Sequence, residues 1–126
     1  MSFSNTFETH VLNYVFTTTT LARPTAWYLA LFTTNPGDGD SGTEVSGGGY
    51  VRQSVTFTTS GDTASNSAAV EFPTATAGYG TVSHVGVYTA STGGTLIAHA
   101  ALSSSKSIET GDVFRIPSGD LDITLD

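Results

Sequence analysis

The feature that most restricts the fold is the way in which apolar residues recur after residue 25. They lie in short stretches of alternating or continuous hydrophobicity, which glycine, proline and serine turns separate. Alternation with a period of two is typical of strands that bury one face, and about seven or eight such stretches recur every 8–15 residues or so. The spacing predicts a mostly β fold, an antiparallel β-sandwich or a jelly-roll-like domain over residues 25–126.

Several stretches predict individual strands. Ala26–Phe32 is apolar on both faces, which is typical of a central strand that is covered on both sides. Two alternating stretches flank Thr92-Gly93-Gly94 and predict a hairpin. Tyr50–Thr58 and the stretch from Asn66 to Phe72 are each expected to be one strand, and polar Ser103–Ser107 is expected to be a loop.

One segment has the period of a helix. Its apolar residues are spaced by three or four positions and would form one face: Phe7, Val11, Tyr14 and Val15. Asn5 followed by Glu8 resembles a capping box at the start, and four threonines after Phe16 are poor helix formers. We therefore expect one domain over residues 1–126, with an N-terminal helix at 5–16 and no linker.

Composition excludes several classes of partner. The chain has 126 residues, four basic and eleven acidic side chains, a net charge of −7 and no cysteine. Such a chain has no cationic stripe for phosphates, so nucleic-acid binding is not expected. No apolar run approaches the roughly 20 residues of a membrane span, so no membrane partner is expected either.

The acidic loop after residue 36 suggests two kinds of site. Its sequence from Gly37 to Gly42 satisfies the dinucleotide pattern G-x-G-x-x-G, but no helical pattern follows to receive a phosphate. Asp38, Asp40 and Glu44 could instead surround a calcium ion with carboxylate oxygens. A solvated acidic loop explains the same residues, so calcium binding stays open.

Other candidate chemistry is sparse. His84 and His99 fall opposite each other, or diagonally, across the predicted hairpin, but no further zinc ligands accompany them. No nucleophile, acid and base can be named together, so neither catalysis nor a cofactor is expected. A carbohydrate-binding module is the alternative, because Tyr50 and Tyr79 flank glycine-rich turns and are expected to be exposed.

Five stretches together resemble a known family. They are Trp27–Pro36, the Gly-rich stretch Glu44–Gln53 with its E-x-x-G-G-G-Y-x-R pattern, the stretch Asn66–Thr76 with its N-x-A-x-V-x-F-P-x-A-T pattern, Val82–Tyr88, and the ending Gly119–Leu125. Their order is similar to that of a family of small virion structural proteins of tailed bacteriophages, often labelled tail-fibre or minor structural proteins. Tyr79 stands where many relatives have Trp, and no catalytic residue comes with the resemblance.

The resemblance implies a non-enzymatic protein of the virion, assembled in the cytoplasm of the bacterial host. A small domain without a repetitive shaft favours a capsid decoration protein, which would form a homo-oligomer, a trimer above all, over the major capsid protein. A tail-fibre, baseplate or receptor-binding component that meets other tail proteins is the alternative. The residues expected to make contacts are Phe7, Val11, Tyr14, Tyr50, Arg52 and Tyr79.

Overall fold

Antiparallel sheets make up most of the structure, a computed structural model that describes residues 1–125. The largest, sheet A, has the strand order β1-β8-β7-β2-β3. Its members are β1 (Ser2–Phe3), β2 (Tyr28–Phe32), β3 (Gln53–Ser54), β7 (Gly80–Tyr88) and β8 (Leu96–Ile108). The long β7–β8 ladder is the predicted hairpin, and it turns at the predicted glycines.

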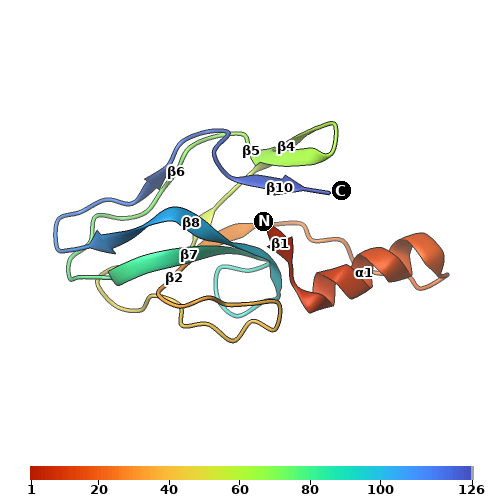
Figure 1. Ribbon diagram of the computed structural model, residues 1–126, viewed down its shortest axis with the longest axis horizontal. Coiled ribbons are helices and arrows are strands. Elements are labelled where there is room, and N and C mark those ends of the chain that lie inside the picture. Colours follow the sequence, from red (N-terminus) through yellow and green to blue (C-terminus); the bar gives the residue numbers. More distant parts are fainter. Residues whose placement is uncertain (126) are drawn as a thin grey trace.

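Two smaller sheets form the second layer, above β2, β7 and β8 in Figure 1. Sheet B contains β4 (Phe57–Ser60), β5 (Thr63–Asn66) and β10 (Asp122–Thr124), and sheet C contains β6 (Val70–Glu71) and β9 (Arg115–Ile116). The fold class is therefore confirmed: mostly β, antiparallel, with one short helix at the N-terminus. Ten strands occur within residues 1–125, more than the seven or eight expected, because bends divide some of the predicted strands.

Strand β2 lies in the middle of sheet A and is covered on both faces, as predicted. Leu29 and Leu31 point into the main core between the layers, and both are completely buried. Ala30 and Phe32 point the other way, into a second apolar cluster with Tyr88 and Leu96. Two cores on opposite faces explain why this stretch is apolar at every position.

Asn66 marks the largest difference from the strand prediction. The stretch from Asn66 to Phe72 was expected to be one strand, but the chain leaves sheet B at Asn66 and enters sheet C at Val70. The buried Asn66 side chain stabilises this corner by donating from Nδ2 to the carbonyl oxygens of Ala68 and Pro117, at 2.9 and 3.0 Å. Tyr50–Thr58 is likewise divided between β3 and β4.

Strand β8 runs further than its composition suggests. Ser103–Ser107 was expected to be a loop, but these polar residues continue β8 as far as Ile108. The prediction was wrong because β7 provides ladder partners, pairing Gly80 with Ile108 and Val82 with Lys106. Polar side chains are tolerated there because this half of the strand lies at the protein surface.

The only helix among residues 1–125, α1 (Asn5–Phe16), has the predicted bounds but a different cap. Ser4, not Asn5, is the N-cap: its hydroxyl accepts a hydrogen bond from the Phe7 N–H at 3.3 Å. The same buried hydroxyl donates to the Leu96 carbonyl oxygen of β8 at 2.5 Å. The first turn is thereby attached to sheet A, and the rest of α1 extends away from the sheets (Figure 1).

Candidate functional site

The six residues expected to make contacts fall into two groups. Phe7, Val11 and Tyr14 lie along α1. Tyr50, Arg52 and Tyr79 lie together beside the glycine-rich loop, where the Tyr50 and Tyr79 ring centroids are 5.8 Å apart. The two groups differ in one property that matters for binding, namely exposure.

The α1 group is open to solvent. None of the helix side chains is buried, and the exposed fraction rises from a half-buried Phe7 to 41% at Val11 and 75% at Tyr14. The segment after the helix lies beside it, so that a shallow groove forms. Its apolar lining includes Phe7, Val11, Tyr14, Leu21 and Pro24.

A second row of apolar side chains on α1 includes Leu12 and Phe16, which sequence periodicity did not place on a face. Together with Val15, which it did, they have exposed fractions of 58%, 78% and 59%, respectively. Leu12 and Phe16 are four residues apart, and that spacing, read for a second face, is the signal that would have found them. The end of α1 is therefore apolar on two sides.

The glycine-rich group is built around an ion pair that sequence reasoning did not predict. Arg52 donates from Nε to Glu44 Oε2 at 2.9 Å and from Nη2 to Glu44 Oε1 at 2.8 Å. The fork-shaped guanidinium and the planar carboxylate thus form a bidentate pair across the loop. The sequence feature that could have predicted this ion pair is the pair of opposite charges at the two ends of the Gly-rich stretch.

Arg52 makes further contacts within the chain. Nη1 donates to the carbonyl oxygens of Ala90 and Gly93 at 3.0 and 2.7 Å, in the β7–β8 turn. Its guanidinium carbon lies 3.7 Å from the centre of the Tyr88 ring, which is a cation–π contact. With only 9% of its side chain exposed, Arg52 connects the loop to sheet A.

Tyr50 is part of the same network. Its hydroxyl donates to Glu44 Oε2 at 2.6 Å and accepts from the Leu31 N–H at 3.0 Å. Burial, together with the bond to the Glu44 carboxylate, raises the pKa of Tyr50 far above its usual range. The ring stacks on Phe72 with a centroid distance of 5.9 Å, so Tyr50 joins the loop to the main core.

Tyr79 corrects an expectation of exposure. It is buried, with 5% of its surface exposed, because its ring packs into the main core and its hydroxyl donates to the Pro73 carbonyl oxygen at 3.0 Å. Neither Tyr79 nor the half-buried, internally bonded Tyr50 offers a free ring face of the kind a sugar needs. These two residues therefore do not support a carbohydrate-binding module.

The ion pair predicts a pH dependence of stability. Burial alone would raise the pKa of Glu44, but the hydrogen bonds from Arg52 and Tyr50 outweigh it and lower the pKa below its ordinary value of 4.5. The stabilisation that ionised Glu44 contributes is therefore complete above pH 4.5. It is lost as the pH falls through the pKa of Glu44 in the folded state, which is lower.

We expect Glu44→Gln to lower the free energy of unfolding by about 2 kcal/mol at pH 7. Urea denaturation is measured from pH 7 downwards. The difference in free energy of unfolding between this variant and the unmodified chain should shrink below pH 4.5, the pKa of Glu44 in the unfolded state. Exposed Glu71→Gln is the matched control and should show no such gap at any pH. A gap for Glu44→Gln that stayed constant down to about pH 3 would contradict the assignment.

The three acidic side chains considered for calcium have separate partners. Asp38 Oδ1 lies 2.7 Å from His99 Nε2, Asp40 accepts from the Tyr88 hydroxyl at 2.5 Å, and Glu44 binds Arg52. Within residues 1–125, no three His, Cys, Asp or Glu side chains lie close enough to hold a metal ion. The loop therefore uses its carboxylates to attach itself to sheet A.

The two histidines are diagonal neighbours across the β7–β8 ladder, one of the two arrangements expected. His84 pairs with Ala101 and His99 with Gly86. His84 Nδ1 lies 2.8 Å from the Ser83 hydroxyl oxygen, while His99 contacts Asp38. The two rings thus have different partners.

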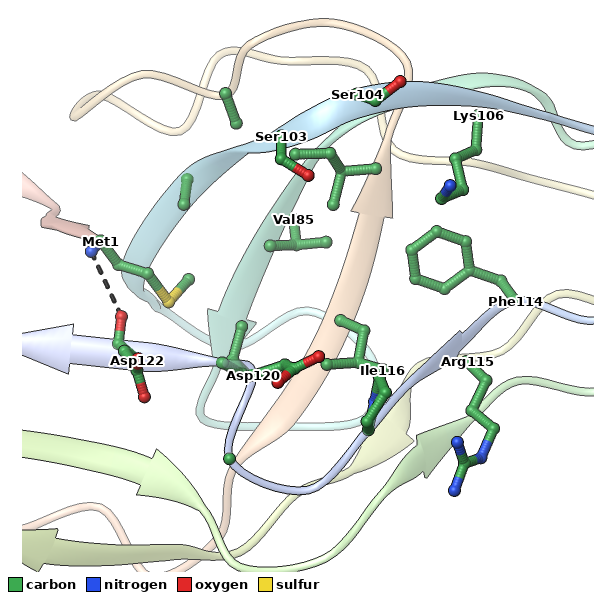
Figure 2. Close-up of a pocket in the computed structure, with 16 residues that line it drawn as sticks. Met1, Val85, Ser103, Ser104, Lys106, Phe114, Arg115, Ile116, Asp120 and Asp122 are labelled. Carbon is green, nitrogen blue, oxygen red and sulfur yellow. Dashed lines mark hydrogen bonds between the residues drawn. The ribbon is translucent and has the colours of Figure 1, made fainter.

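A hollow lies between β8 and the segment that contains β9 (Figure 2). It has a volume of about 540 Å³, and its walls combine Ser103 and Ser104 of β8 with Phe114, Ile116 and Asp120. The hydrogen bond drawn in Figure 2 joins the Met1 amino group to the Asp122 carbonyl oxygen at 3.3 Å. Small hydroxyls and apolar side chains predominate, an arrangement that does not by itself suggest a reaction.

Comparison with known proteins identifies the family. Residues 2–124 match the family model described as Podophage GP4 fiber I protein gp80. No curated protein matches the chain. Nothing helical in residues 1–125 is long and apolar enough to cross a membrane. Since the match covers nearly the whole chain and agrees with the resemblance seen in its motifs, this protein belongs to the gp80 fibre family of phage virion structural proteins.

Proposed function

We propose that this protein is a non-enzymatic structural subunit of a phage fibre, built into the particle through its N-terminal helix. The observation that carries the proposal is the concentration of exposed large apolar side chains on α1, which has five of them against three in the rest of residues 1–125. An exposed apolar surface of this kind is typical of a protein contact. The name of the family model, which contains the word fiber, supports placing the contact in a fibre.

A capsid decoration protein is the second candidate. Its support is the shape of the chain: an antiparallel sandwich whose described residues, 1–125, contain no repeated unit that would build an elongated shaft. Such a body suits a protein that stabilises a shell by burying area across subunit boundaries. Both candidates have structural partners, tail proteins for the first and the major capsid protein for the second.

Labelling of intact particles separates the two candidates. An antibody against the folded chain, or a small tag placed after Leu125, is imaged on the virion by electron microscopy. We expect label at the fibres and none on the head. Label spread over the head would favour decoration, and particles free of the protein would contradict both.

A further inference from the structure

Helix α1 is too short and too weakly attached to be stable by its own sequence. It has 12 residues, and helices of this length are marginal in water unless tertiary contacts support them. Its last turn carries no basic side chain to offset the helix dipole. Apart from the capped first turn, its apolar side chains lie in solvent, so the helix needs a cover that one copy of the chain does not supply.

Two apolar surfaces on α1 face in different directions. The ridge comprises Leu12, Val15 and Phe16, and the groove is lined by Phe7, Val11, Tyr14, Leu21 and Pro24. At 3.6 residues per turn, the centre of the ridge lies about a third of a turn from the helical side of the groove. A ridge and a groove at different positions on one molecule can meet only when the ridge of one copy enters the groove of the next.

The exposed apolar area sets how large such a contact can be. Five side chains that are 41–78% exposed, Val11, Leu12, Tyr14, Val15 and Phe16, present on the order of 600 Å². Because the ridge and the groove of one copy meet different neighbours, this area, together with Leu21 and Pro24 of the groove, makes up the two sides of one contact. A standard interface buries roughly 1,600 Å² over both partners, so the contact must also bury polar surface around α1.

Charge favours a second copy as the occupant. Glu8 and Arg23 are the only charged side chains among residues 1–27, so the whole net charge of −7 comes from the remaining residues. Two strongly acidic bodies repel each other, and they can meet most easily through a neutral segment. The N-terminal segment is neutral and apolar at once, which makes it the surface through which identical copies can approach.

We propose that the ridge of α1 packs into the groove of a second copy of this chain, and that repetition of the contact closes a cyclic homo-oligomer. A contact between two different surfaces generates a ring when the rotation closes, and a trimer is such a ring. This inference rests on the proposed function, because it names the partner that covers α1 in the fibre.

The test is the mass of the full chain in solution. Light scattering during gel filtration, from about 1 to 100 μM, should give a multiple of the 13.0 kDa monomer. Phe16→Asp and Leu12→Asp should each weaken association at least about tenfold, because a charge would enter an apolar contact. Val51→Asp is the matched control, since Val51 is equally exposed (56%) but lies outside α1, and it should leave the mass unchanged.

Hydrogen exchange supplies a second readout on the same samples. Residues 5–16 should be protected in the oligomer and should exchange rapidly in Phe16→Asp, while the β7–β8 ladder stays protected in both. Protection of the ladder also verifies that the variant is folded. A chain that is monomeric at 100 μM or so, or oligomers that survive both α1 substitutions, would overturn the inference.

The two proposals fail in different ways. If the chain is monomeric and particles incorporate both it and Phe16→Asp normally, the proposed self-association is wrong. The proposed structural role is then unaffected. If the chain forms oligomers that depend on α1 but is never found in particles, the self-association is supported and the structural role is wrong.

Discussion

Replacing Arg52 by alanine is expected to lower the free energy of unfolding by about 3 kcal/mol. The substitution leaves the Glu44 carboxylate, half-buried beside Tyr50, without its ionic partner. It also removes two hydrogen bonds to the β7–β8 turn and the contact with the Tyr88 ring. Urea denaturation at pH 7 measures the change, and the lost stability should appear as a lower midpoint with an unchanged slope.

Two further variants show whether geometry or charge matters at this position. Arg52→Lys keeps the charge but cannot form the bidentate pair and reach the turn together, so it should restore less than about half of the loss. Arg23→Ala is the control, because Arg23 is exposed, and it should change stability by less than about 0.5 kcal/mol. Full stability in Arg52→Lys would mean that charge alone suffices.

Replacing Asn66 by alanine is expected to cost a similar amount, about 3 kcal/mol. Its side-chain amide donates to two carbonyl oxygens and its Oδ1 accepts from the Leu121 N–H at 2.9 Å, so three backbone groups would lose a partner inside the protein. Only 1% of Asn66 is exposed, so water cannot easily take its place. Thermal and urea unfolding both report this loss.

The design of that experiment separates hydrogen bonding from size. Asn66→Asp has the same shape and keeps the acceptor for Leu121, but it cannot donate to Ala68 and Pro117, so it should be at least as unstable as the alanine variant at pH 7. The control is exposed Asn5→Ala, for which a change of less than about 0.5 kcal/mol is expected. An Asn66→Asp protein as stable as the unmodified chain would show that the corner does not depend on these donors.

Both predictions concern residues of the family-like motifs, and both assign them to the fold. Glu44, Tyr50 and Arg52 form one internal network, and Asn66 stabilises the corner between two sheets. Tyr50 and Arg52 were expected to contact a partner, yet their polar groups already bond within the chain. The surface proposed for assembly lies on α1, outside the motif stretches.

Sequence periodicity predicted the elements whose environment is uniform along their length. The bounds of α1 depend on local spacing and on the run of threonines after Phe16, both visible in the sequence. Strand β2 was recognisable as central because a strand covered on both faces must be apolar throughout. Ser103–Ser107 was misassigned because its pairing partner, Gly80–Val82 of β7, lies more than twenty residues away and leaves no mark on its composition.

By itself, the sequence determined the β-rich class, the one helix and the virion family, since these follow from local periodicity and from ordered motifs. The tertiary structure alone decided which polar side chains meet: Glu44 with Arg52, Asp38 with His99, and Asn66 with three backbone groups. It also decided that Tyr79 is buried while Leu12 and Phe16 are exposed. The physical reason is that burial and pairing depend on what packs against a residue, and that neighbour is distant in the chain.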